Sequence, residues 1–118
     1  HFSFFVLTLP KYFPELTIAK EGFFSKIAQA VGYDDIDFES HEFSRRFVVR
    51  SKDKKFAYDF CNARMIDYLL GHSDINLEVD QNMLALGFGS RLKVEEIEPH
   101  LNNLIKIRSL MPDYLFDG

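Results

Sequence analysis

The 118-residue sequence has a single cysteine, four prolines and no tryptophan. One cysteine cannot form an intrachain disulfide, and it excludes zinc sites built from several cysteines. Basic charge is also scarce, because 14 lysines and arginines stand against 18 aspartates and glutamates, for a net charge of −4. Nucleic-acid-binding domains are normally basic, so we expect no nucleic-acid partner.

Long hydrophobic runs are absent as well. The apolar run Phe2–Leu9 is far shorter than the ~20 residues that a membrane helix needs. No basic segment precedes it, so it does not have the form of a signal peptide. We therefore expect no direct insertion of this chain into a membrane. The sequence begins with His1 instead of a methionine, which favours a fragment of a larger protein.

The overall composition is typical of a folded domain. Apolar residues make up 47% of the sequence and charged residues 27%, which is close to the globular average. At this length, about two-thirds of the surface can be buried on folding. No repeat or linker divides the chain, so we expect a single domain over residues 1–118.

Several segments have the pattern of β-strands. Phe2–Leu9 is rich in aromatic and β-branched residues and is apolar on both alternate faces, which is typical of a strand covered on both sides. Further strands are predicted at residues 16–19, 43–51, 75–79 and 83–88. The polar residues 80–82 between the last two predict a hairpin.

Helical spacing of apolar residues is found at 21–31, 53–71 and 94–111. In the second region, one apolar face is formed by Phe56, Ala57 and Phe60. Another is formed by Met65, Ile66, Leu69 and Leu70, roughly 150° away on a continuous helix. Because Asn is a good N-cap, we expect two helices, the second starting at Asn62. The predicted fold class is α+β, with a mainly antiparallel sheet of about four to five strands and helices packed on one face.

Several stretches together resemble a bacterial family of uncharacterised proteins. The stretches are Leu9-Pro10, Glu21-Gly22, Asp35-Ile36-Asp37-Phe38 and, above all, His41-Glu42-Phe43-Ser44-Arg45-Arg46-Phe47. The similarity covers almost the whole chain and is most specific over residues 34–50. It implies that the chain is the C-terminal part of a larger protein, often with membrane helices upstream, and it implies no activity. The chain departs from the family pattern at Cys61-Asn62, where Thr-Pro is common.

One segment carries a possible cation site. If residues 35–41 are extended, alternation places four potential ligands on one face: Asp35, Asp37, Glu39 and His41. Three carboxylates and an imidazole could hold a divalent cation. The pattern of a calcium-binding loop fails, because Ser40 stands where glycine is required. The other interpretation is the solvated face of an edge strand or loop.

Two neighbouring segments carry equal and opposite net charge. Residues 34–42 are acidic, and residues 44–55 hold six cationic side chains, which are Arg45, Arg46, Arg50, Lys52, Lys54 and Lys55. We predict that at least one of Arg45, Arg46 and Arg50 pairs with a carboxylate from residues 34–42. The alternative is a docking surface on which these arginines bind a phosphate or a carboxylate.

No pattern for catalysis is complete. Cys61 lies among apolar residues, where cysteine is usually a small buried hydrophobe. Gly87–Ser90 follows a predicted strand but completes neither a dinucleotide-binding nor a P-loop pattern. We therefore expect no catalytic residue and no cofactor.

Aromatic residues are unusually concentrated at the N-terminus. The chain has 13 phenylalanines, and we expect Phe2, Phe4 and Phe5 to contact a protein partner or a second copy of the chain. The predicted function is a non-enzymatic binding or regulatory module of a larger bacterial protein, cytoplasmic or tethered to the membrane through upstream sequence. One alternative is a metal-dependent enzyme or ion sensor that uses residues 35–41. Another is a small-ligand sensor with a pocket between sheet and helices.

Overall fold

A computed structural model of the chain describes residues 3–20, 35–72, 74–88 and 91–117. Strands β1 (Ser3–Ala19), β2 (Val48–Ser51) and β3 (Asn76–Phe88) form an antiparallel sheet in the order β2-β1-β3. The helices are α2 (His41–Arg46), α3 (Lys54–Phe60), α4 (Ala63–Leu70), α5 (Val94–Leu110) and the 3-10 helix η1 (Asp113–Phe116). The predicted α+β class is confirmed. The helix predicted at 21–31 lies outside the described residues.

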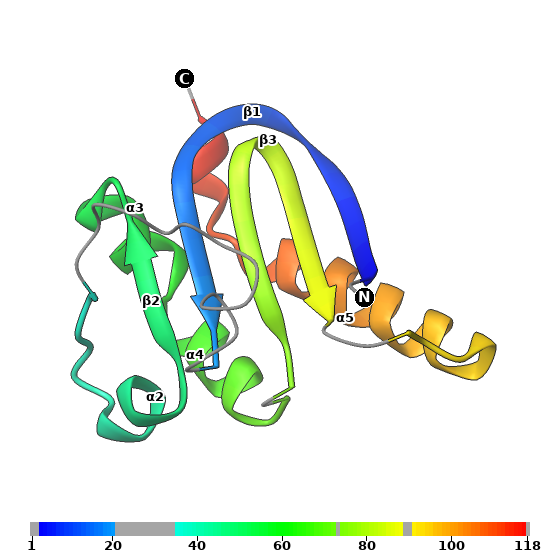
Figure 1. The fold of residues 1–118 in the computed structure, drawn as a ribbon. Coiled ribbons are helices and arrows are strands. Elements are labelled where there is room, and N and C mark those ends of the chain that lie inside the picture. Colours follow the sequence, from blue (N-terminus) through cyan, green and yellow to red (C-terminus); the bar gives the residue numbers. More distant parts are fainter. Residues whose placement is uncertain (1–2, 21–34, 73, 89–90, 118) are drawn as a thin grey trace.

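The described part of the chain has three strands instead of four to five, because two pairs of predicted strands are each one long, bent strand. β1 joins the predicted strands at 2–9 and 16–19, and β3 joins those at 75–79 and 83–88. In Figure 1, β1 forms an arch and β3 folds back beneath it. The Asn76 side-chain amide donates a 3.3 Å hydrogen bond to the Gly87 carbonyl. In a straight strand these residues would lie roughly 36 Å apart.

The bend of β1 lies next to the bend of β3. The register between β1 and β3 shifts on both sides of Phe13, which pairs with Gln81 at the tip of β3. Pro10 and Pro14 fall in this part of β1, and proline is confined to edges and bulges because it cannot donate to the ladder. The polar residues that predicted a hairpin therefore mark the point where β3 folds back.

The strand predicted at 43–51 is wrong in its first half. Residues 41–46 form α2, and β2 starts only at Val48. The Ser40 side chain accepts a 3.3 Å hydrogen bond from the Phe43 N–H, as an N-cap does. Glu42 in the first turn and Arg45 and Arg46 in the last complement the helix dipole. These terminal signals outweigh the aromatic residues that favoured a strand.

The predicted break between α3 and α4 is confirmed. The Asn62 side-chain oxygen accepts a 3.0 Å hydrogen bond from the Met65 N–H and caps α4. The Asn62 side-chain amide also donates to the Leu110 carbonyl at 3.1 Å, at the end of α5. The two apolar faces can therefore both be buried, because each belongs to its own helix.

One hydrophobic core lies between the sheet and the helices. In Figure 1, α4 and α5 lie behind the sheet. The largest fully buried side chains come from both layers and include Leu16, Ile18, Leu77, Leu84, Leu86, Phe43, Phe60, Met65, Leu69, Leu104 and Ile107. The opposite side of the sheet, which we call the outer face, presents the alternate residues of the same strands.

Candidate functional site

The four residues predicted as a cation site are all exposed and alternate with inward-facing residues, of which Ile36 is buried and Phe38 half-buried. Asp35 forms an isolated β-bridge with Arg50, whereas His41 is the first residue of α2. The residues between them are in neither a helix nor a strand. Among the described residues, the groups whose ligand atoms gather closely enough to hold a metal ion do not include these four. Their exposure, with Ile36 and Phe38 turned inward, agrees with the interpretation as a solvated face.

The arginines next to this segment are engaged within the chain. Arg50 Nε lies 2.7 Å from a carboxylate oxygen of Asp35. Arg46 lies 3.7 Å from the Glu42 carboxylate and donates a 2.9 Å hydrogen bond to the Leu70 carbonyl. These contacts confirm the predicted pairing between the two charged segments. Arg45 is exposed. Of the three arginines, it is therefore the one best placed to bind an external phosphate or carboxylate, as the docking alternative requires.

The N-terminal arm of β1 alternates instead of being covered on both sides. Phe5 is half-buried, and its ring packs edge-on against Phe88 with 6.0 Å between centroids. Phe4 and Val6 point the other way and are 52% and 54% exposed. Phe5 therefore belongs to the core side, and Phe2 lies outside the described residues. Of the three predicted contact residues, Phe4 is the one that the structure places on the outer face.

Exposed apolar side chains of β1 and β3 lie side by side on the outer face. Val6 is the cross-strand partner of Ala85, and Thr8 is the partner of Met83, and directly opposed residues share a face. Met83 is 45% exposed. We call the set Phe4, Val6, Met83 and Ala85 the outer apolar patch.

Three carboxylates gather on the outer face as well. One carboxylate oxygen from each of Glu15, Glu78 and Asp80 lies within 4.8 Å of the other two, and we call these residues the acidic cluster. Glu78 alternates with the buried Leu77 and Val79, so it points away from the core. Burial, followed by the charges of Asp80 and Glu15, raises the pKa of Glu78. The cluster depends on the pairing of distant segments, and no local sequence pattern could have revealed it.

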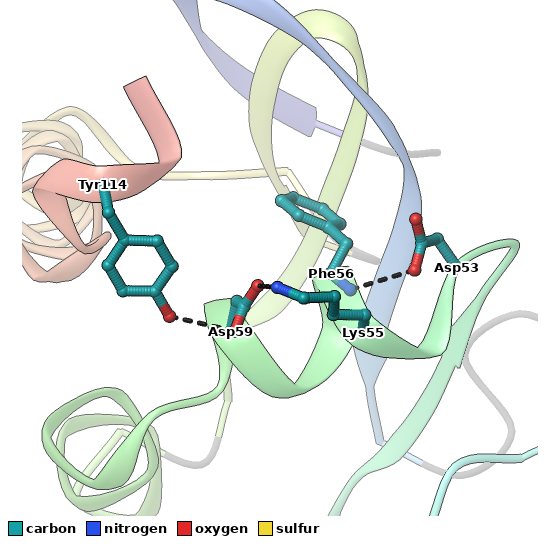
Figure 2. A network of polar contacts seen from close by, with 5 residues as sticks. All are labelled: Asp53, Lys55, Phe56, Asp59 and Tyr114. Atoms are coloured by element: carbon teal, nitrogen blue, oxygen red, sulfur yellow. Dashed lines mark hydrogen bonds and ion pairs between the residues drawn. The ribbon is translucent and has the colours of Figure 1, made fainter. Parts of the chain in front are cut away.

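A hollow of about 310 Å³ lies where the bend of β1 meets α3 and η1. Figure 2 shows Asp59 at the centre of its polar network. Lys55 Nζ lies 2.8 Å from one Asp59 carboxylate oxygen, and the Tyr114 hydroxyl donates to the other at 2.9 Å. The hydrogen bond from Lys55 is the main cause that lowers the pKa of Asp59. Because these groups satisfy one another, we assign the network a structural role in holding η1 on α3.

The single cysteine is not placed for chemistry. Cys61 is 4% exposed, and burial raises the pKa of its thiol. A thiolate is the reactive form of cysteine. The side chain therefore acts as a small apolar group in the core.

Comparison of the chain with protein-family models, with curated proteins and with solved structures finds no match. In the described part of the chain, no helix combines the length and the apolar character needed to cross a membrane. The outer face brings the outer apolar patch and the acidic cluster together on one surface.

Proposed function

We propose that the chain is a non-enzymatic binding module whose outer face binds a protein segment carrying both apolar and cationic side chains. The observation that supports this most strongly is the presence of the outer apolar patch and the acidic cluster on one side of one sheet. Within this proposal, the module belongs to a larger bacterial protein, as the resemblance of residues 34–50 implies.

The apolar half of the surface favours a partner over open water. Phe4, Val6 and Met83 are each about half exposed, so a partner could still remove much of their surface from solvent. Complete burial of such a side chain contributes about 1.5–3 kcal/mol. Because these three side chains are already partly buried, each would contribute only part of that free energy on binding. Contiguous apolar surface of this kind is typical of protein-interaction sites.

The acidic half selects the charge of the partner. Three carboxylates within 4.8 Å of one another repel, and no cation of the described residues forms an ion pair with them. Burial is the main cause of the raised pKa of Glu78, and the crowding with Asp80 and Glu15 adds to it. A lysine or arginine of a bound segment would relieve the repulsion, so cationic side chains favour binding and acidic ones oppose it.

Selection from a library of random 16-residue peptides tests the proposal, because such a library offers apolar, acidic and cationic segments alike. We expect the enriched peptides to combine apolar residues with lysine or arginine. Their affinity should fall at least tenfold, or about 1.4 kcal/mol, for Phe4→Ser. Glu78→Gln should weaken binding mainly at low salt, because added ions screen the attraction between charges at a surface.

Tyr12→Ser is the matched control. Tyr12 is 69% exposed but lies in the bend of β1, outside the outer apolar patch, so its loss should leave the affinity unchanged. Enrichment of acidic peptides, or equal binding by wild type and Phe4→Ser, would contradict the proposal.

A further inference from the structure

Helix α5 has a second apolar stripe that the core does not use. Its buried side chains are Leu104, Ile107 and Leu110. The other apolar residues are exposed to different extents, with Val94 at 81%, Ile97 at 39%, Leu101 at 40% and Ile105 at 59%. We call these four residues the α5 stripe.

The four side chains of the α5 stripe form a continuous surface along the helix. At 100° per residue, the four side chains fall within an arc of about 80°, centred about 125° from the buried side chains. They recur at intervals of three and four residues over three turns. This is the pattern of a helix that packs against another helix.

The N-terminal half of α5 stands away from the body of the molecule. In Figure 1 it extends past the sheet, beyond the arrowhead of β3. Residues 93–95 and 97–99 are all exposed. A second helix can therefore approach the stripe along this half without displacing any element of the fold.

We propose that α5 pairs antiparallel with α5 of a second copy of this chain. The N-terminal half of α5 carries Glu95, Glu96 and Glu98, and its C-terminal half carries Lys106 and Arg108. At 100° per residue, Glu98 and Arg108 are the charges that flank the α5 stripe. The Arg108 guanidinium lies over the Phe116 ring, 4.0 Å from its centroid, at the edge of the proposed contact. An antiparallel pair places each acidic half against a cationic half, whereas a parallel pair places like charges together. In the antiparallel pair, the positive end of each helix dipole also lies beside the negative end of the other, which is favourable.

Symmetry fixes the register of the pair. A twofold axis beside Leu101 places this residue against Leu101 of the partner subunit, and it places Ile97 against Ile105 of the partner subunit. A 17-residue helix is about 25 Å long, and such a contact buries less than the ~800 Å² per partner of a standard interface. We therefore expect a weak dimer, with a dissociation constant of about 10–100 μM.

This inference does not depend on the proposed function. The α5 stripe belongs to a helix on the core side of the sheet, whereas the outer apolar patch belongs to the opposite face. A membrane surface is a less suitable occupant, because helices that lie on membranes have lysine- and arginine-rich polar faces, and the exposed half of α5 is acidic.

Sedimentation equilibrium between 5 and 500 μM tests the dimer. We expect the mean mass to rise from one chain toward two, and Ile105→Glu should weaken the association at least tenfold. Asn102→Glu adds the same charge on the exposed polar side of α5 and is the matched control. A monomer throughout the range, or equal loss of association in both variants, would overturn the inference.

Disulfide trapping tests the orientation. Leu101→Cys places two thiols at the symmetry axis and should crosslink readily, whereas Val94→Cys places them near opposite ends of an antiparallel pair. The native Cys61 is buried, so it does not compete. Equal crosslinking at both positions would indicate a parallel pair and would contradict the proposal, whatever the outcome of the peptide selection.

Discussion

At the scale of the residue, Asp59 illustrates a charge whose partners lie within the chain. Its carboxylate accepts hydrogen bonds from Lys55 and Tyr114 (Figure 2), and the pKa of Asp59 is lowered. A carboxyl group with a lowered pKa in the folded state stabilises the fold above its unfolded pKa. That contribution is lost as the pH falls through the folded pKa.

We therefore expect Asp59→Asn to lower the free energy of unfolding at pH 7 and to have little effect near pH 2. Urea unfolding of wild type and variant at a series of pH values measures the difference. Asp67→Asn, which removes an exposed carboxylate from the neighbouring helix α4, is the control. A difference between wild type and Asp59→Asn that stays constant from pH 7 to pH 2 would show that the ionised carboxylate is not the cause.

Among the described residues other than glycine, Gln81 has a positive φ, of 55°. Side chains with a Cβ adopt this region at a cost of about 1–2 kcal/mol, so Gln81→Gly should stabilise the protein by about 0.5–1 kcal/mol. Asn82→Gly, at the adjacent position without positive φ, should destabilise it by a similar amount. Urea unfolding of both variants measures this. Stabilisation by both substitutions would indicate an effect on the unfolded chain instead.

At the scale of the element, Asn62 connects two helices and the end of a third. Asn62→Ala removes the cap of α4 and the contact with the Leu110 carbonyl, so we expect a loss of about 1–2 kcal/mol in unfolding free energy. Asn62→Asp keeps the capping oxygen but loses the amide donor, and it should cost less. Equal losses in the two variants would mean that the cap contributes nothing, and thermal unfolding can compare them.

The break at Asn62 could be predicted because both of its signals are local. The apolar face changes direction between Phe60 and Met65, and a capping residue stands between them. Helix α2 has a local cap at Ser40 too, but its aromatic residues also suited a strand. The merging of strands could not be predicted, because it depends on the pairing of Phe13 with Gln81 across 68 positions.

The outer face was predictable only in part. The aromatic run pointed to the N-terminal arm, and Phe4 is exposed as expected for a contact residue. Phe5 lies on the core side because strand alternation separates neighbours, and the sequence alone did not indicate which of them faces inward. The acidic cluster depends on Glu15 meeting Glu78, and their approach follows from the register of β1 and β3.

At the scale of the whole molecule, the fold separates two exposed apolar surfaces. The outer apolar patch lies on one face of the sheet, and the α5 stripe lies on a helix packed against the other face. A dimer formed through α5 would leave both outer faces accessible. Paired copies would then bind two segments of a partner, which raises the apparent affinity when the segments are linked.

The most direct test of the proposed function is a methyl NMR titration of the labelled chain with an enriched peptide. We predict shift changes at the methyl groups of Val6, Met83 and Ala85, with the methyl groups of Ile105 on α5 unchanged. The changes should saturate with peptide and disappear in Phe4→Ser. Saturable changes confined to α5 or to the hollow near Tyr114, with Val6 and Met83 unaffected, would contradict the assignment of the outer face as the binding surface.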